Sequence, residues 1–158
     1  MSYFKTLLRI IAVSVATLLA STTFAADSSQ HKIVNGMAIY LGMLPAEMIL
    51  GHPKPHPEAE MHGGVPARGS QYHVMVVLFD NATGKRITGA RVKANVSLIG
   101  LSGVQKKLEP MLIAGTVTYG NYFNMSANDN PYRIRVLVEL PGTPGVIEAT
   151  FEYRHALA

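Results

Sequence analysis

Residues 131–140 read PYRIRVLVEL, and this stretch decides the fold class of the chain. Apolar residues alternate along it with arginine and glutamate. The apolar set is Tyr132, Ile134, Val136, Val138 and Leu140. A period of two residues places side chains on one face of a β-strand. The stretch therefore predicts a strand with one buried face and one solvent-facing face.

Similar segments occur on both sides of this strand. Residues 86–100, RITGARVKANVSLIG, and residues 146–155, VIEATFEYRH, show the same alternation. Residues 71–80, QYHVMVVLFD, are apolar on both faces, as expected for a strand in the middle of a sandwich. Turn sequences such as NATGK at residues 81–85 separate the segments. This pattern predicts an all-β protein, an immunoglobulin-like antiparallel β-sandwich of about seven strands.

Two other segments complete the predicted domain organisation. Residues 1–25 combine two basic residues, an uncharged apolar run and small residues at the end, which predicts a secretory signal peptide cleaved before Ala26. Residues 51–70, GHPKPHPEAEMHGGVPARGS, predict a long loop because they are rich in Pro and Gly. We expect one β-sandwich domain over residues 26–158, located in the periplasm. No later segment has the roughly 20 apolar residues of a membrane-spanning helix.

Composition argues against several classes of function. The chain has no cysteine, which rules out disulfides, thiolate metal sites and a cysteine nucleophile. It contains no Gly-x-Ser-x-Gly element and no glycine-rich nucleotide-binding motif. The net charge of +4 falls to +2 without the two basic residues of the leader, and no basic cluster remains. We therefore expect neither an enzyme nor a nucleic-acid-binding protein.

Histidine and methionine are concentrated around the first central strand. His73 and Met75 are two residues apart, so their side chains share one face, and Met61 with His62 ends the preceding loop. Imidazole nitrogen and thioether sulfur suit copper, whereas calcium or magnesium would need more carboxylates. The alternative is structural, with Met75 filling the core and His73 a buried histidine whose hydrogen bonds are satisfied.

Two methionines elsewhere favour the metal interpretation. Met111 follows Pro110 at the expected end of a loop, and Met125 precedes a polar turn; neither is a core position by alternation. His155 continues the inward register of the last strand, and we interpret it as a residue of the sandwich rim, with approach to the metal as the alternative. The candidate metal ligands are His62, Met111, His73, Met61 and Met125.

Several short pieces of the chain resemble the periplasmic iron-transport family, copper-binding proteins of β-sandwich fold. These pieces are NGMAIYLGMLPAEM, EAEMH, VMVVLFDNATGKRI, EPM, TYG and YRIRVLVELPG. The resemblance implies that His62 and Met111 are copper ligands, with Glu58 or Glu60 as a carboxylate neighbour.

The chain departs from this family at two expected ligands. Thr118 stands where the family has a histidine before Tyr-Gly, and PGTPGVIE replaces a histidine-rich turn. His73 or His155 would have to substitute for them. A less specific resemblance links FDNATGKRITGARVKANVSL to other exported sandwich modules related to copper.

These observations lead to two hypotheses from different classes. The first is a periplasmic copper-binding protein that carries the metal or assists a transporter, with a membrane metal transporter or a metallochaperone as partner. The second is a metal-free exported module that docks on a membrane complex through its Pro/Gly-rich loop or an edge strand.

Overall fold

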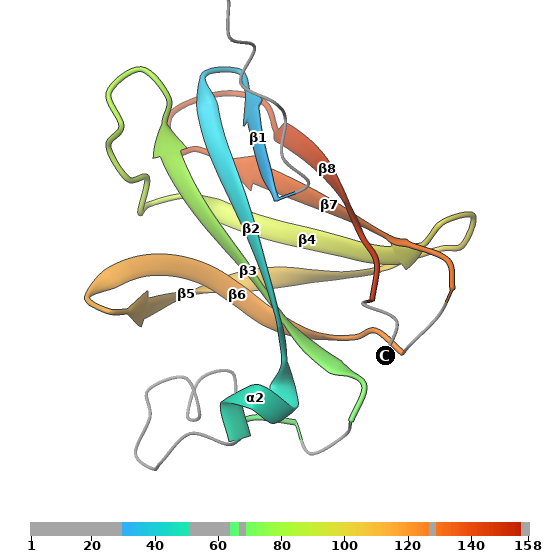
Figure 1. Ribbon diagram of the computed structural model, residues 1–158. Helices are drawn as coiled ribbons and strands as arrows, with labels where there is room; N and C mark the ends of the chain where they lie inside the picture. The colour runs from blue at the N-terminus through green and yellow to red at the C-terminus, as the bar shows by residue number, and fades with distance from the viewer. Residues whose placement is uncertain (1–29, 51–63, 67–68, 127–128, 156–158) are drawn as a thin grey trace, which may run out of the picture.

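The computed structural model describes residues 30–50, 64–66, 69–126 and 129–155 (Figure 1). The predicted signal peptide and most of the predicted loop lie outside these residues. The elements are β1 (His31–Val34), β2 (Met37–Pro45), α2 (Ala46–Leu50), β3 (Gln71–Asp80), β4 (Arg91–Leu98), β5 (Val104–Ile113), β6 (Thr116–Asn124), β7 (Tyr132–Glu139) and β8 (Ile147–Tyr153). No helix in the described part of the chain has the length and apolar character needed to cross a membrane.

The strands form an antiparallel sandwich, as the sequence predicts. Their order is β1-β2-β3-β6-β5-β4-β7-β8, and every neighbouring pair is antiparallel. The described residues form eight strands, one more than the predicted seven, because Asn35 and Gly36 form a tight turn that makes β1 a separate strand. Both turn residues have positive φ angles, the geometry that suits a two-residue hairpin. Since β1 also contacts β8, the sandwich is nearly closed.

Strand β5 belongs to both sheets. Residues 104–108 pair with β4, and residues 109–113 pair with β6. The prediction that Met111 lies at the end of a loop is therefore wrong, because the strand continues through Pro110 and Met111. Proline lacks a backbone donor and is tolerated where a ladder changes partner.

Side chains bridge the backbone ladders at this change of partner. The amide of Asn121 donates a hydrogen bond to the Lys107 carbonyl at 2.8 Å. The ammonium of Lys106 donates to the Tyr122 carbonyl at 2.7 Å and lies over the Phe123 ring. These contacts connect β6 with the half of β5 that pairs with β4.

The core fills the space between the two sheets. The alternating apolar residues of 131–140 are confirmed as inward-facing, with Ile134, Val136 and Val138 completely buried. On β3 the core residues are Val74, Val76 and Leu78. Met75 is half-buried and lies outside this core cluster, so the interpretation of Met75 as core filler is wrong.

One buried tyrosine also connects the sheet to a loop. The phenolic oxygen of Tyr119 accepts a hydrogen bond from the Ala90 backbone N–H at 3.0 Å. Burial raises the pKa of this phenol. This hydrogen bond attaches the loop before β4 to Tyr119 of β6.

The predicted turn at residues 81–85 is also present. The Asp80 carboxylate accepts hydrogen bonds from the backbone N–H and the hydroxyl of Thr83, each at 2.7 Å. These bonds lower the pKa of Asp80. The Asp80 N–H bonds to the Lys85 carbonyl at 2.8 Å and closes the turn.

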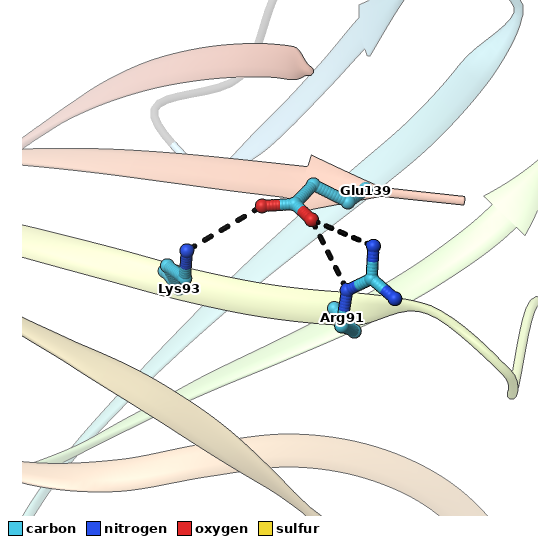
Figure 2. Close-up of polar contacts among 3 residues, drawn as sticks. All are labelled: Arg91, Lys93 and Glu139. Atoms are coloured by element: carbon cyan, nitrogen blue, oxygen red, sulfur yellow. Dashed lines mark hydrogen bonds and ion pairs between the residues drawn. The ribbon is translucent and has the colours of Figure 1, made fainter. Parts of the chain in front are cut away.

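The outer face of the β4-β7-β8 side carries cross-strand charge pairs. Figure 2 shows Glu139 of β7 between Arg91 and Lys93 of β4. One carboxylate oxygen accepts two bonds from Arg91 at 2.9 and 3.1 Å, and the other accepts a bond from Lys93 at 3.4 Å. Hydrogen bonds from Arg91 and then Lys93 lower the pKa of Glu139. This solvent-facing side is polar, as alternation predicts.

Replacing Tyr119 by Phe should destabilise the protein by about 1–3 kcal/mol, because the Ala90 N–H would lose its acceptor. Urea unfolding of both proteins measures the difference. Tyr40→Phe is the matched control: this ring is exposed, so a change within about 0.5 kcal/mol is expected. Equal effects of the two substitutions would contradict the role of the Tyr119 hydroxyl.

The Glu139 pairs should make stability depend on pH. Since the folded pKa lies below the ordinary value near 4.5, the stabilisation is complete above that value and is lost as the pH falls through the folded pKa. Glu139→Gln should therefore destabilise the protein at neutral pH and have a diminishing effect in acid. Unfolding curves of the wild type and of Glu139→Gln from pH 7 to pH 3 test this. A pH-independent Glu139→Gln effect is the contrary result.

Candidate metal site

The site is built on the face of β3, β6 and β5 that points away from the core. In the sheet register Met75 is paired with Gly120, and Met111 is paired with Thr118. His73 lies two residues before Met75, so the two side chains share a face. Paired residues of antiparallel strands also share a face. His73, Met75 and Met111 thus lie on the same outer surface.

Two donor atoms converge above Gly120. A Cβ atom placed at Gly120 would lie 2.7 Å from Nε2 of His73, 3.1 Å from Sδ of Met111 and 2.6 Å from Cε of Met111. The imidazole nitrogen and the thioether sulfur therefore lie within 3.1 Å of one point. Gly120 does not have a positive φ angle, so space rather than backbone conformation requires glycine here. A glycine inside a strand often marks such a close approach.

Both donors are buried and one is held by an aromatic ring. His73 has no exposed surface, and Met111 is 4% exposed. The His73 ring stacks on Tyr122, with ring centroids 4.7 Å apart and planes inclined by 25°. Stacking restricts rotation of the imidazole, so it helps to keep Nε2 beside Met111.

The helix α2 covers this part of the face. Tyr122 forms a small apolar cluster with Ala46 and Ile49 of α2, and Val65 packs against the same cluster. Ile49 and Val65, which lie on either side of residues 51–63 in the sequence, are therefore both next to the ring that stacks on His73. The candidate ligands Met61 and His62, and the carboxylates Glu58 and Glu60, lie outside the described residues.

The structure does not bring Met125 to the His73–Met111 pair. Met125 is completely buried in the core cluster between the sheets, whereas His73 and Met111 lie on the outer face. The sequence predicted that Met125 is not a core position, because it precedes a polar turn. In the structure Met125 follows the last residue of β6 and continues the inward alternation of that strand.

His155 also lies away from the pair. Its Nδ1 atom is 3.0 Å from the Tyr72 hydroxyl, and its ring contacts Tyr72, Tyr132 and Tyr153. Burial and a hydrogen bond to Tyr72 raise the pKa of Tyr153 to about 12. Tyr72 precedes His73 in β3 and so faces the other side of the sheet. His155 therefore lies with the core-side tyrosines.

The two departures from the resembling family have different positions. Thr118 is buried and is the cross-strand neighbour of Met111, so it lies at the site but offers only a hydroxyl oxygen. The turn between β7 and β8 lines a depression together with Asn35. Asn35 lies just before Met37, which pairs with Asp80 at the end of β3. His73 pairs with Leu44 near the other end of β3, so this depression lies away from His73.

The donor set of the described site is one imidazole and one thioether. No three His, Asp or Glu side chains come together anywhere in the described ranges. A nitrogen–sulfur pair suits a soft or borderline transition metal. Sequence reasoning missed Gly120 and Tyr122. The signal for Gly120 was a glycine inside the apolar run TYGNYF.

Comparison with known proteins identifies relatives by fold only. No protein-family model matches the chain, and no curated protein matches its sequence significantly. A DUF4426 family protein from Pseudomonas aeruginosa PAO1 superposes with a TM-score of 0.56 at 16% identity, covering 81% of this chain and 96% of that one.

Two crystal structures of FetP from uropathogenic Escherichia coli strain F11 are also similar. A copper-bound variant gives a TM-score of 0.54 at 15% identity, with 80% of this chain and 93% of FetP covered. FetP as isolated after expression in the periplasm gives 0.57 at 16%, with 79% and 93% covered. The resemblance to periplasmic iron-transport proteins is thus confirmed for the fold.

Gly120→Ala should destabilise the protein by about 1–3 kcal/mol, because its methyl group would overlap His73 and Met111. Gly42→Ala is the matched control. Gly42 pairs with Met75 from the other side, and the nearest atom to its methyl would be Cε at the flexible end of Met75, at 3.3 Å. We expect less than about 1 kcal/mol there. Denaturant unfolding measures both, and equal losses would contradict the crowding at Gly120.

Proposed function

We propose that this protein is an exported, periplasmic copper-binding protein that carries Cu(I) or passes it to a membrane metal transporter. The observation that carries the proposal is the convergence of His73 Nε2 and Met111 Sδ above Gly120. A variant of FetP, which shares the fold, has a solved structure with copper bound. Copper is cargo in this proposal, and the expectation that the protein is not an enzyme is part of it.

The chemistry of the pair favours Cu(I) over harder cations. Thioether sulfur is a soft ligand that selects Cu(I), and imidazole binds copper in either oxidation state. Magnesium and calcium prefer oxygen ligands. Burial of both donors adds to this preference because it keeps water, a competing oxygen ligand, away from the ion.

His62 and Met61 remain proposed ligands that would complete the site. His62 precedes Val65 by three residues, and three residues span at most about 11 Å. Val65 packs in the cluster that contains Tyr122, the ring stacked on His73. The reach of the chain is therefore compatible with a third donor from this segment.

A Cu(I) competition titration on the mature chain tests the site. We expect stoichiometric binding tighter than about 1 µM, and a loss of at least about tenfold in Met111→Leu and in His73→Phe. Leu preserves the volume of Met111, and Phe preserves stacking on Tyr122. Gly120→Ala should weaken binding although it removes no donor, because its methyl occupies the space above the strand.

Met125→Leu is the control for this titration, since Met125 is a core methionine and its replacement should leave Cu(I) affinity unchanged. Unchanged affinity in the His73→Phe/Met111→Leu double variant would contradict the site. Failure of the wild type to bind Cu(I) would favour the metal-free interaction module. In that case deletion of residues 52–66 should abolish partner capture with or without copper.

A further inference from the structure

The turn between β4 and β5, together with the first residue of β5, exposes three aliphatic side chains within six residues. Ile99 is 40% exposed, Leu101 is 65% exposed and Val104 is 59% exposed. We call residues 99–104 the β4–β5 tip. Single exposed apolar residues are common, but a cluster of them marks an interaction site.

The β4–β5 tip has a defined conformation. The Leu101 N–H bonds to the Leu98 carbonyl at 3.0 Å, and the Ile99 N–H bonds to the Pro131 carbonyl at 3.3 Å. Gly103 packs against β4 so closely that a Cβ atom there would lie 2.8 Å from the Val96 carbonyl oxygen. The backbone thus holds the aliphatic side chains outward, where they remain in solvent.

The shape of the tip does not suit a stable protein interface. Figure 1 shows the β4–β5 connection extending from the end of β4, away from the rest of the sandwich. A stable interface buries about 800 Å² on each partner, more than one six-residue turn supplies. The tip also lacks tyrosine, tryptophan and arginine, the residues that dominate binding energy at protein interfaces. A membrane surface needs no shaped pockets, and its binding strength is the sum of the apolar area buried and the attraction to anionic lipids.

The charges near the tip favour an anionic membrane. Residues 95–108 contain no acidic residue, and Lys106 and Lys107 follow the tip on β5. Arg133 is the cross-strand neighbour of Ser97 on one side and of Glu152 on the other, and Lys106 donates a hydrogen bond to the Tyr122 carbonyl. Two acidic residues are also near the tip. Asp129 lies two residues before Pro131, whose carbonyl accepts the Ile99 N–H, and Glu109 is paired with Lys107 at 3.0 Å. Cations behind a small apolar surface are typical of interfacial membrane binding.

We propose that the β4–β5 tip inserts its three aliphatic side chains into the headgroup region of an anionic bilayer, so that the protein docks reversibly on a membrane surface. This contact does not depend on copper binding, because the tip shares no residue with the metal site. It would bring a soluble carrier into the same plane as a membrane transporter.

Fluorescence provides a sharp test because the chain contains no tryptophan. Leu101→Trp places a reporter at the tip, and its emission should shift to shorter wavelength with phosphatidylethanolamine/phosphatidylglycerol vesicles. Leu112→Trp is the matched control, since Leu112 is 62% exposed at the opposite end of β5 and should show no shift. An equal shift at both positions, or none at Leu101→Trp, would overturn the proposal.

Vesicle co-sedimentation of the mature chain without a reporter gives a second measurement. Replacing Ile99, Leu101 and Val104 together by Ser should reduce the bound fraction at least about fivefold, whereas Leu112→Ser should not change it. Pure phosphatidylcholine vesicles should bind less protein than the anionic ones. Binding that requires a membrane protein in the vesicles would also overturn the proposal and indicate a protein partner.

Discussion

The change of partner within β5 is the constraint on which the rest of the structure depends. The first half of this strand pairs with β4 and the second half with β6, so one continuous backbone joins the two sheets. Alternation through the junction sends Leu108 into the core and Met111 to the outer face. The position of a soft donor on the outer surface is thus a direct result of how the sandwich is closed.

The candidate site combines features that are individually ordinary. A histidine on β3 and a methionine on β5 flank a glycine on β6, and the glycine allows their donor atoms to approach one point. Tyr122 stacks on the histidine and carries the packing of α2. Because all three strands belong to one hydrogen-bonded ladder, the donors are positioned by the sheet itself. This arrangement suits reversible binding of a soft cation better than acid–base chemistry.

Much of the fold could be predicted from local sequence pattern. Alternation in residues 131–140 and 86–100 identified the strands and their inward faces, because a two-residue period is a direct consequence of strand geometry. The sequence pattern did not reveal that β5 continues through Pro110. Whether a strand can contain a proline depends on which strands it pairs with at that point, and local pattern does not show this pairing.

The site was harder to predict for a related reason. Residues 71–80 are apolar on both faces, and the sequence does not indicate which face meets the other sheet. The structure assigns Val74 and Val76 to the core, and His73 with Met75 to the outer face. Met125 was misjudged because its burial depends on how β6 ends. His73 and Met111 were both identified from their chemistry, but their meeting at Gly120 requires the tertiary pairing of β3, β6 and β5.

The path of β5 also has a consequence for the order of folding. Strands β4, β5 and β6 are consecutive in the chain and are joined by short turns, so their pairing closes only small loops. The pairing of β3 with β6 joins segments that lie much farther apart in sequence, and such contacts form slowly. We therefore expect Met111 to be placed beside Thr118 early, in a three-stranded nucleus that already contains parts of both sheets. His73 arrives only when β3 docks, so the two donors meet late in folding, and a newly synthesised chain has no complete His73–Met111 pair until then.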